Sequence, residues 1–170
     1  MTTHANRGKN FESLIDKSNE AYEFQEIALV NKIPNEFIVQ RDWRTKQIVK
    51  AFPGKKSTVD YMGVIFGGIP ISFEAKSTVN KKSFPISNIK EHQITFLEKW
   101  KGQKGLAFYL INFSTFDRTF LLFPEQLREE FLKNGLKSIS LDFFEQNCIE
   151  VFNQALIPID YITALKGRYI

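Results

Sequence analysis

The chain has 170 residues, which favours one domain, and 43% of them are hydrophobic, which indicates a globular rather than a disordered chain. Its single cysteine excludes an internal disulfide and a cysteine-built zinc site, so we expect a cytoplasmic location. No apolar run approaches the roughly 20 residues of a membrane span, and the net charge of +4 permits binding to a polyanion.

The N-terminal half predicts one long helix, a charged segment and a pair of strands. Apolar residues recur at helical spacing from Lys9 to Ile33, and Pro34 ends that pattern. A strand is expected over Glu36–Gln40, before the charged segment. Two more strands are expected after it, over Ser57–Phe66 and Ile69–Lys76.

The C-terminal half alternates between helical and strand patterns. The expected elements are a polar loop over Ser77–Pro85, a helix over Asn88–Lys101, apolar strands over Leu106–Phe113 and Arg118–Phe123, a short helix over Glu125–Lys133 and a final helix capped by Asp160. This order predicts a single α/β domain over residues 1–170, with a mixed central β-sheet flanked by helices.

Cations are concentrated in Arg41–Lys56, where Asp42 is the one acid and Trp43 and Phe52 are interleaved. One interpretation of this segment is a protruding basic arm whose charges meet phosphates while its aromatic residues pack or stack. A solvated loop is the alternative, and it is the commoner one for a charge run taken alone. The candidate DNA contacts are Arg7, Arg41, Arg44, Lys46, Lys50, Lys55, Lys56, Lys81 and Lys82.

The two strands that follow this segment carry acids that can face each other. Alternation places Ser72, Glu74 and Lys76 on one face of the second strand, which we expect to open on a cleft. Asp60 meets Glu74 only if the connecting loop is Phe66–Gly68, because a two-residue loop would turn Asp60 away. Such a loop needs a left-handed glycine, so we predict this loop or an equivalent bulge.

Two facing carboxylates repel each other, and a divalent cation relieves that repulsion. Mg²⁺ prefers oxygen ligands, polarises a phosphoryl oxygen and lowers the pKa of a bound water. The ammonium of Lys76 can stabilise charge on the phosphate. Asp60, Glu74 and Lys76 are therefore candidate catalytic residues of a nuclease, although an ordinary ion pair between Glu74 and Lys76 fits the spacing equally well.

Two more residues are candidates for this site. Gln93 falls in the apolar stripe of its helix, where a buried amide needs a partner, either a metal with its water or a neighbouring backbone group. Glu12 could reach the site as an accessory carboxylate, or be a solvated acid near a helix N-terminus. Since the chain has no phosphate-loop motif, we predict no nucleotide cofactor.

Several motifs follow one another along nearly the whole chain. They are Asn6-Arg7-Gly8 with Glu12, Thr58-Val59-Asp60-Tyr61 with Gly63, Phe73-Glu74-Ala75-Lys76, Ser83-Phe84-Pro85, His92-Gln93-Ile94 and Ile159-Asp160-Tyr161-Ile162. In this order they resemble the RecU-type Holliday junction resolvases of the PD-(D/E)xK nuclease superfamily. The resemblance implies a nuclease-like fold of that superfamily and Lys76 as the transition-state stabiliser. It also implies Mg²⁺, for which Mn²⁺ can substitute, with ligands Thr58, Asp60, Glu74 and Gln93.

The same resemblance implies a homodimer whose two sites cut a four-way DNA junction by symmetric nicks during recombination and repair. Residues 41–56 would then form a stalk that enters the open centre of the junction. A recombinase or branch-migration machinery is a further expected partner. Two alternatives stay open: an endonuclease of this superfamily acting on linear or other branched DNA, and a non-cleaving DNA-binding module that modulates a recombinase.

Overall fold

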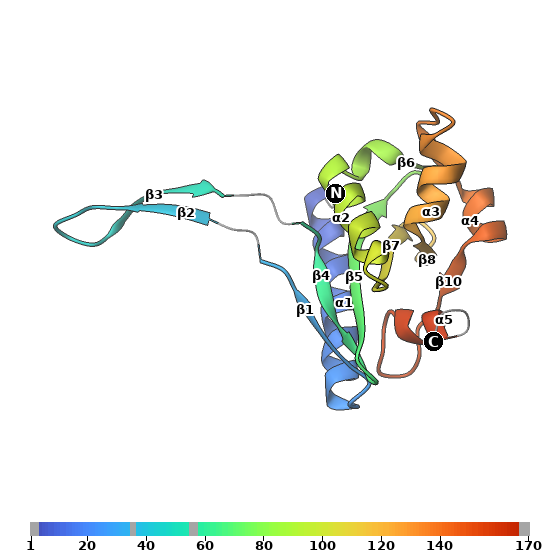
Figure 1. Ribbon diagram of the computed structural model, residues 1–170, viewed down its shortest axis with the longest axis horizontal. Coiled ribbons are helices and arrows are strands. Elements are labelled where there is room, and N and C mark those ends of the chain that lie inside the picture. Colours follow the sequence, from blue (N-terminus) through green and yellow to red (C-terminus); the bar gives the residue numbers. More distant parts are fainter. Residues whose placement is uncertain (1–3, 35–36, 55–57, 167–170) are drawn as a thin grey trace.

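A six-stranded sheet forms the centre of the computed structural model, which describes residues 4–34, 37–54 and 58–166 (Figure 1). Its strands, in spatial order, are β1 (Ala28–Lys32), β4 (Tyr61–Ile65), β5 (Ile69–Thr78), β7 (Leu106–Phe113), β8 (Arg118–Leu122) and β10 (Ile149–Val151). Neighbouring strands are antiparallel except β5 and β7, which run parallel. A parallel pair needs a crossover, and this one contains helix α2 (Glu91–Gly102). The expected mixed sheet is confirmed.

Helices cover both faces of the sheet, as the sequence predicted. On one face α1 (His4–Phe24), which lies behind the sheet in Figure 1, and α5 (Tyr161–Lys166) enclose one apolar core. The helical segments of the other face are η1 (Ile86–Asn88), α2, α3 (Pro124–Gln126), η2 (Leu127–Leu132) and α4 (Leu141–Asn147). Within the described chain, no helix combines the length and apolar character that a membrane span requires.

The predicted first helix is wrong at both ends. The observed helix α1 begins at His4 and ends at Phe24, whereas Lys9 and Ile33 were predicted. Glu26 then adopts a left-handed φ of 56°. The next residues form β1, in which Ala28 and Val30 are buried while Leu29 is exposed. That alternation has the period of a strand, but five residues are too short to separate it from the helical spacing before them.

The charged segment forms a β-hairpin rather than a loop. Strands β2 (Phe37–Arg41) and β3 (Ile48–Pro53) form a separate two-stranded sheet in the part of the chain that the structure describes, and they project away from the body (Figure 1). We call residues 37–53 the β2–β3 hairpin. It starts earlier than the predicted arm, because Phe37 to Arg41 form its first strand.

One strand of a second short ribbon lies within Ser77–Pro85, which was predicted to be a loop. β6 (Ser83–Pro85) pairs with β9 (Ser138–Ser140) in antiparallel register. Each strand has three residues, which is too few for a periodic pattern to be visible in the sequence.

The β4–β5 hairpin has the predicted connection. Tyr61 pairs with Phe73 and Ile65 with Ile69, which leaves Phe66–Gly68 as a three-residue loop. Gly67 and Gly68 have φ values of 92° and 84°, which residues other than glycine rarely adopt. The first strand starts at Tyr61 rather than Ser57, so Asp60 directly precedes it.

Aromatic stacking holds the middle of the sheet together. The ring of Phe73 lies between those of Tyr61 and Phe108, with both centroids at 4.8 Å. Tyr161 of α5 contacts the same Phe73 ring at 4.9 Å. These contacts fix β4 against β5, and therefore fix the backbone on which Asp60 and Glu74 are carried.

Candidate active site

Asp60 and Glu74 meet at one corner of the sheet. The backbone N–H of Asp60 donates a hydrogen bond to Glu74 Oε2 at 3.1 Å. The backbone N–H of Ala75 donates to Asp60 Oδ2 at 3.0 Å. Each carboxylate thus accepts a backbone N–H from the segment that carries the other acid, so backbone groups help to position both.

Lys76 and Gln93 both donate to Glu74. Lys76 Nζ lies 2.5 Å from Glu74 Oε1, and Gln93 Nε2 donates to the same oxygen. The amide oxygen of Gln93 accepts from the N–H of Lys90 at 2.9 Å, in the first turn of α2. The structure therefore brings Gln93 to the site but turns its nitrogen, not the oxygen that a metal would need, toward Glu74.

The prediction that the face of β5 with Ser72, Glu74 and Lys76 opens on a cleft is wrong. Glu74 and Ser72 are both fully buried, because α2 packs over this end of the sheet. Lys76 keeps 23% of its side chain exposed and Asp60 is half-buried. A substrate would reach the site from the edge formed by Asp60 and Lys76.

Burial raises the pKa of Glu74 to about 8, and the negative charge of Asp60 adds to this while Lys76 opposes it. At neutral pH the side chain therefore binds a proton readily. A cation placed beside the two acids would replace that proton, since it compensates both the lost hydration and the repulsion.

The donor set fits a hard divalent cation. Asp60 and Glu74 supply carboxylate oxygens, and Thr58 is exposed two residues before Asp60. Among the residues that the structure describes, no group of three His, Cys, Asp or Glu side chains could hold a metal. The ion would be held by two carboxylates, with neutral oxygens and water completing its shell, an arrangement that Mg²⁺ accepts.

Glu12 faces a lysine that the sequence analysis missed. Lys32 Nζ lies 2.6 Å from Glu12 Oε2 and 3.7 Å from Asp16 Oδ2. Burial lowers the pKa of Lys32, but the charges of Glu12, Asp16 and Asp60 raise it above its ordinary value. Lys32 pairs with Tyr61 across the two strands, so its place beside Asp60 follows once β1 is recognised as a strand.

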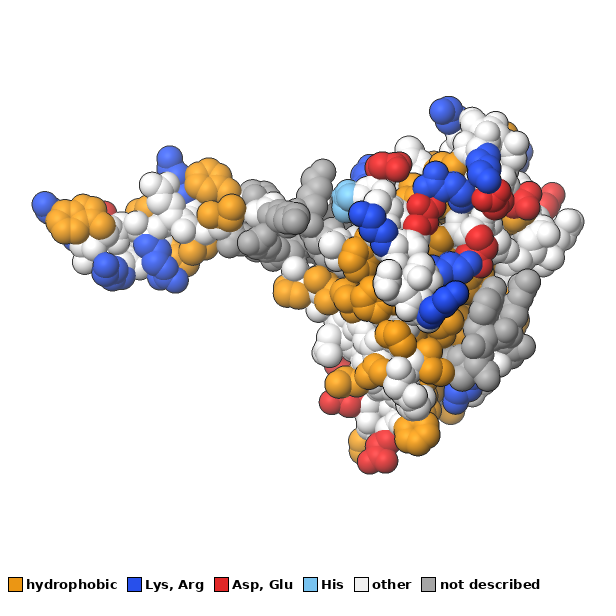
Figure 2. Space-filling view, viewed as in Figure 1, with side chains coloured by type: hydrophobic (Ala, Val, Ile, Leu, Met, Phe, Trp, Pro, Cys, Tyr) orange, Lys and Arg blue, Asp and Glu red, His pale blue; other side chains and the backbone are white. Residues whose placement is uncertain are grey.

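The cations proposed for DNA are mostly exposed. Arg41, Arg44, Lys46 and Lys50 lie on the β2–β3 hairpin, and Lys81 and Lys82 precede β6. Lys55, Lys56 and the side chain of Arg7 lie outside the described residues. Figure 2 shows the hairpin's cations interspersed with hydrophobic side chains along its length.

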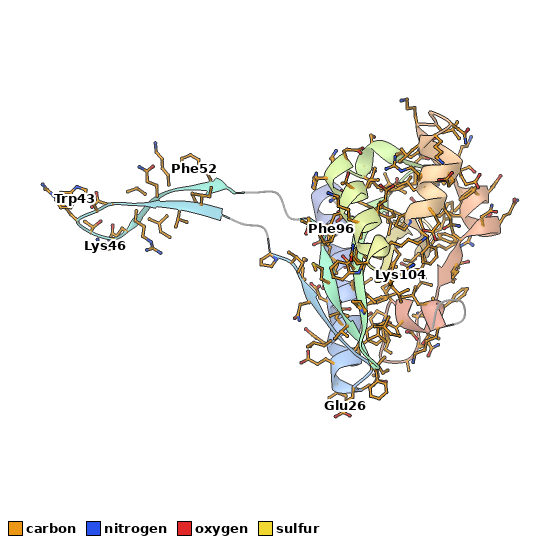
Figure 3. The ribbon with its side chains drawn as sticks, in the orientation of Figure 1. Glu26, Trp43, Lys46, Phe52, Phe96 and Lys104 are labelled. Carbon is orange, nitrogen blue, oxygen red and sulfur yellow. The ribbon has the colours of Figure 1, made fainter. Side chains whose placement is uncertain are left out.

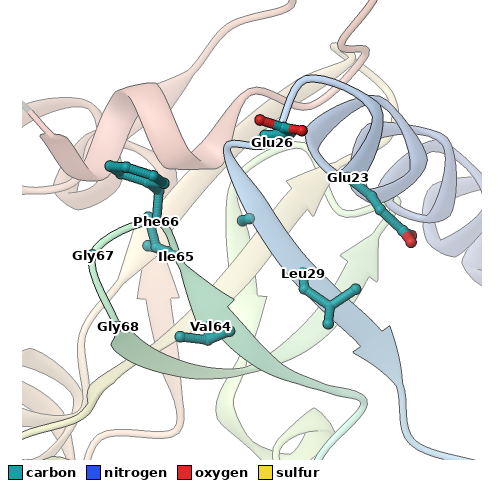
Figure 4. A pocket seen from close by; sticks show the side chains of 9 residues that line it. Glu23, Glu26, Leu29, Val64, Ile65, Phe66, Gly67 and Gly68 are labelled. Atoms are coloured by element: carbon teal, nitrogen blue, oxygen red, sulfur yellow. The ribbon is translucent and has the colours of Figure 1, made fainter.

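The turn between β4 and β5 lines a hollow of about 400 Å³ (Figure 4). This turn is at one end of the β4–β5 hairpin, and Asp60 is at the opposite end. Glu23 and Glu26 contribute its charged groups, and Leu29, Val64 and Phe66 contribute its apolar ones. Among the described residues that line it, the charged groups are both carboxylates, which makes the hollow unsuited to a phosphate ester. The candidate active site is therefore the corner of the sheet where Asp60, Glu74 and Lys76 meet, which we call the carboxylate corner, and not this hollow.

The chain matches known proteins over almost its whole length. The family model "Recombination protein U" (RecU) matches residues 6–167. A Holliday junction resolvase RecU from Streptococcus mutans is 38% identical over 171 residues, which cover 98% of this chain and 86% of the relative. The protein of that name from Streptococcus sanguinis is 37% identical over 176 residues, covering 100% and 87%. That from Lactococcus lactis is 35% identical over 167 residues, covering 95% and 78%.

Proposed function

Since the chain belongs to the recombination protein U family, we propose that it resolves Holliday junctions by Mg²⁺-dependent hydrolysis of phosphodiester bonds. The observation that carries the mechanism is the convergence of Asp60, Glu74 and Lys76 at one corner of the sheet. Two acids and an amine in contact, with only part of the group exposed, are suited to the hydrolysis of a phosphate diester.

Asp60 and Glu74 would hold the metal ion, with Thr58 as a neighbouring oxygen donor. Bound there, Mg²⁺ supplies Lewis acidity toward the scissile phosphate and lowers the pKa of a water. Gln93 and the N–H of Asp60 orient the Glu74 carboxylate and favour its ionised form by donating to it. For Gln93 to act as a ligand itself, its amide would have to turn and leave the N–H of Lys90.

Lys76 would stabilise charge on the phosphate. Its ammonium contacts Glu74 Oε1 and is partly exposed at the edge where the substrate would arrive. If the Glu74 carboxylate served as a metal ligand, the Lys76 ammonium would be available to donate to a phosphate oxygen instead.

Symmetric nicks in a junction need two sites, so we propose that the protein acts as a homodimer. The hairpin cations Arg41, Arg44, Lys46 and Lys50 would neutralise phosphates around the junction and orient it without reading its sequence. A recombinase or branch-migration protein as a further partner stays a prediction.

The test is cleavage of a four-way junction compared with linear duplex of equal length, with Mg²⁺ and with chelator. We expect junction cutting that needs Mg²⁺, and its loss in Asp60→Ala with DNA binding in chelator retained. Glu20→Ala, which changes an exposed acid of α1, is the control and should cut normally. Unchanged cutting by Asp60→Ala would contradict the metal site. Equal cutting of both DNAs would favour an endonuclease for linear DNA, and binding without cutting would favour a non-cleaving module.

A further inference from the structure

The tip of the β2–β3 hairpin is a well-defined turn. Asp42 Oδ1 accepts hydrogen bonds from the N–H groups of Arg44, at 2.9 Å, and Thr45, at 2.8 Å. These backbone hydrogen bonds lower the pKa of Asp42, first through Thr45 and then through Arg44. Arg41 also donates to the carbonyl of Lys46 at 3.1 Å, so the turn has a fixed shape and its one acid faces the backbone.

This turn presents a tryptophan to solvent. Trp43 is 73% exposed and lies at the far end of the hairpin from the body (Figure 3). The guanidinium of Arg44 lies over the indole, 4.7 Å from its centroid. The other tryptophan, Trp100, instead packs against Phe96 and Gly105 in the body. An indole held far from either core contributes little to the fold, and its place suggests a partner.

The surroundings of Trp43 indicate what that partner is. The exposed cations Arg41, Arg44, Lys46 and Lys50 flank the tip, and Asp42 is engaged with the turn. Cations suit phosphates, and an indole face suits a nucleic acid base, which stacks on aromatic rings whatever its sequence. In continuous duplex every base is already stacked on both sides. At the crossing of a four-way junction, the last pair of an arm can expose a base face.

We propose that Trp43, supported by Arg44, stacks on a base face at the branch point and that this contact gives the protein its preference for branched over linear DNA. The inference rests on the proposed function, because it takes the junction as the substrate. The hairpin cations bind phosphates of either DNA, so they supply affinity, whereas the indole finds a free base face only at the branch.

The test places the fluorescent base 2-aminopurine either at the branch point or in the middle of an arm and measures its emission in chelator. Wild type should change the emission at the branch point and not in the arm. Trp43→Ala should lose this change and bind the junction about tenfold more weakly, a typical result of removing one base–aromatic stack. The affinity of Trp43→Ala for linear duplex should be unchanged. Trp43→Phe should recover part of the emission change at the branch point and part of the junction affinity.

Two controls make the result decisive. Circular dichroism establishes that Trp43→Ala is folded. Lys50→Ala should lower the affinity for the junction and for linear duplex by the same factor. The stacking proposal is overturned if Trp43→Ala binds the junction and changes the 2-aminopurine emission as wild type does. It is also overturned if the variant loses the same factor of affinity for the junction and for linear duplex. In either case the proposed function stands. If wild type itself binds both DNAs equally and cuts no junction, the proposed function fails as well.

Discussion

Glu74 is the residue on which the site depends, because it is fully buried and yet contacts Asp60, Lys76 and Gln93. A buried acid with a raised pKa opposes folding at alkaline pH. Its pKa is about 8 in the folded chain, against an ordinary value of 4.5. Between these values the folded state retains a proton that the unfolded state releases, so stability falls as pH rises through this window.

Glu74→Gln removes that pH dependence. In chelator, the free energy of unfolding of the variant relative to wild type should rise by roughly 2–4 kcal/mol between pH 5 and pH 9. Urea denaturation at several pH values measures it, and Glu20→Gln, at an exposed position, should run parallel to wild type. A constant difference between Glu74→Gln and wild type over this range would show that Glu74 is ionised throughout in the folded chain.

At the scale of elements, the β4–β5 hairpin depends on a close approach to β1. A Cβ atom at Gly63 would lie 2.7 Å from Val30 Cα and would also meet the carbonyl oxygen of Leu29. Gly63→Ala must therefore separate β1 from β4, at a cost of about 1–3 kcal/mol. Urea denaturation measures the loss. Gly102→Ala, where a Cβ meets nothing within 4 Å, should change stability little; an equal loss in both variants would contradict this packing.

Strand alternation left two loop lengths open. Gly68, which suits a left-handed position, favoured the three-residue loop that brings Asp60 to Glu74, and the observed register confirms it. Strand alternation could not predict that Glu74 is buried, since this depends on where α2 packs. Gln93 was found because a polar residue in an apolar stripe needs a partner. Lys32 was missed because β1 was assigned to the first helix, which hid its pairing with Tyr61.

At the scale of the whole molecule, a compact body carries the carboxylate corner and the β2–β3 hairpin projects from it (Figure 1). The hairpin's cations are solvated, so their contribution to DNA binding should be electrostatic and sensitive to salt.

Replacing Lys46 and Lys50 together by alanine should weaken junction binding and reduce its salt dependence. Each lost phosphate contact should lower the slope of log affinity against log salt by about 1. Fluorescence anisotropy between about 50 and 200 mM salt measures it. Lys17→Ala, at an exposed position of α1, is the matched control. An unchanged slope in the double variant would exclude the hairpin from phosphate contact.

The central claim is that Asp60 and Glu74 together hold a divalent cation, and calorimetric titration of the metal-free protein with Mg²⁺ tests it most directly. In two buffers of different ionisation enthalpy at pH 7, we predict saturable binding that releases protons, because the ion displaces the proton that Glu74 holds. Asp60→Ala should lose this binding and Glu20→Ala should keep it. Binding that is equal in wild type and Asp60→Ala, or that releases no proton, would contradict the account.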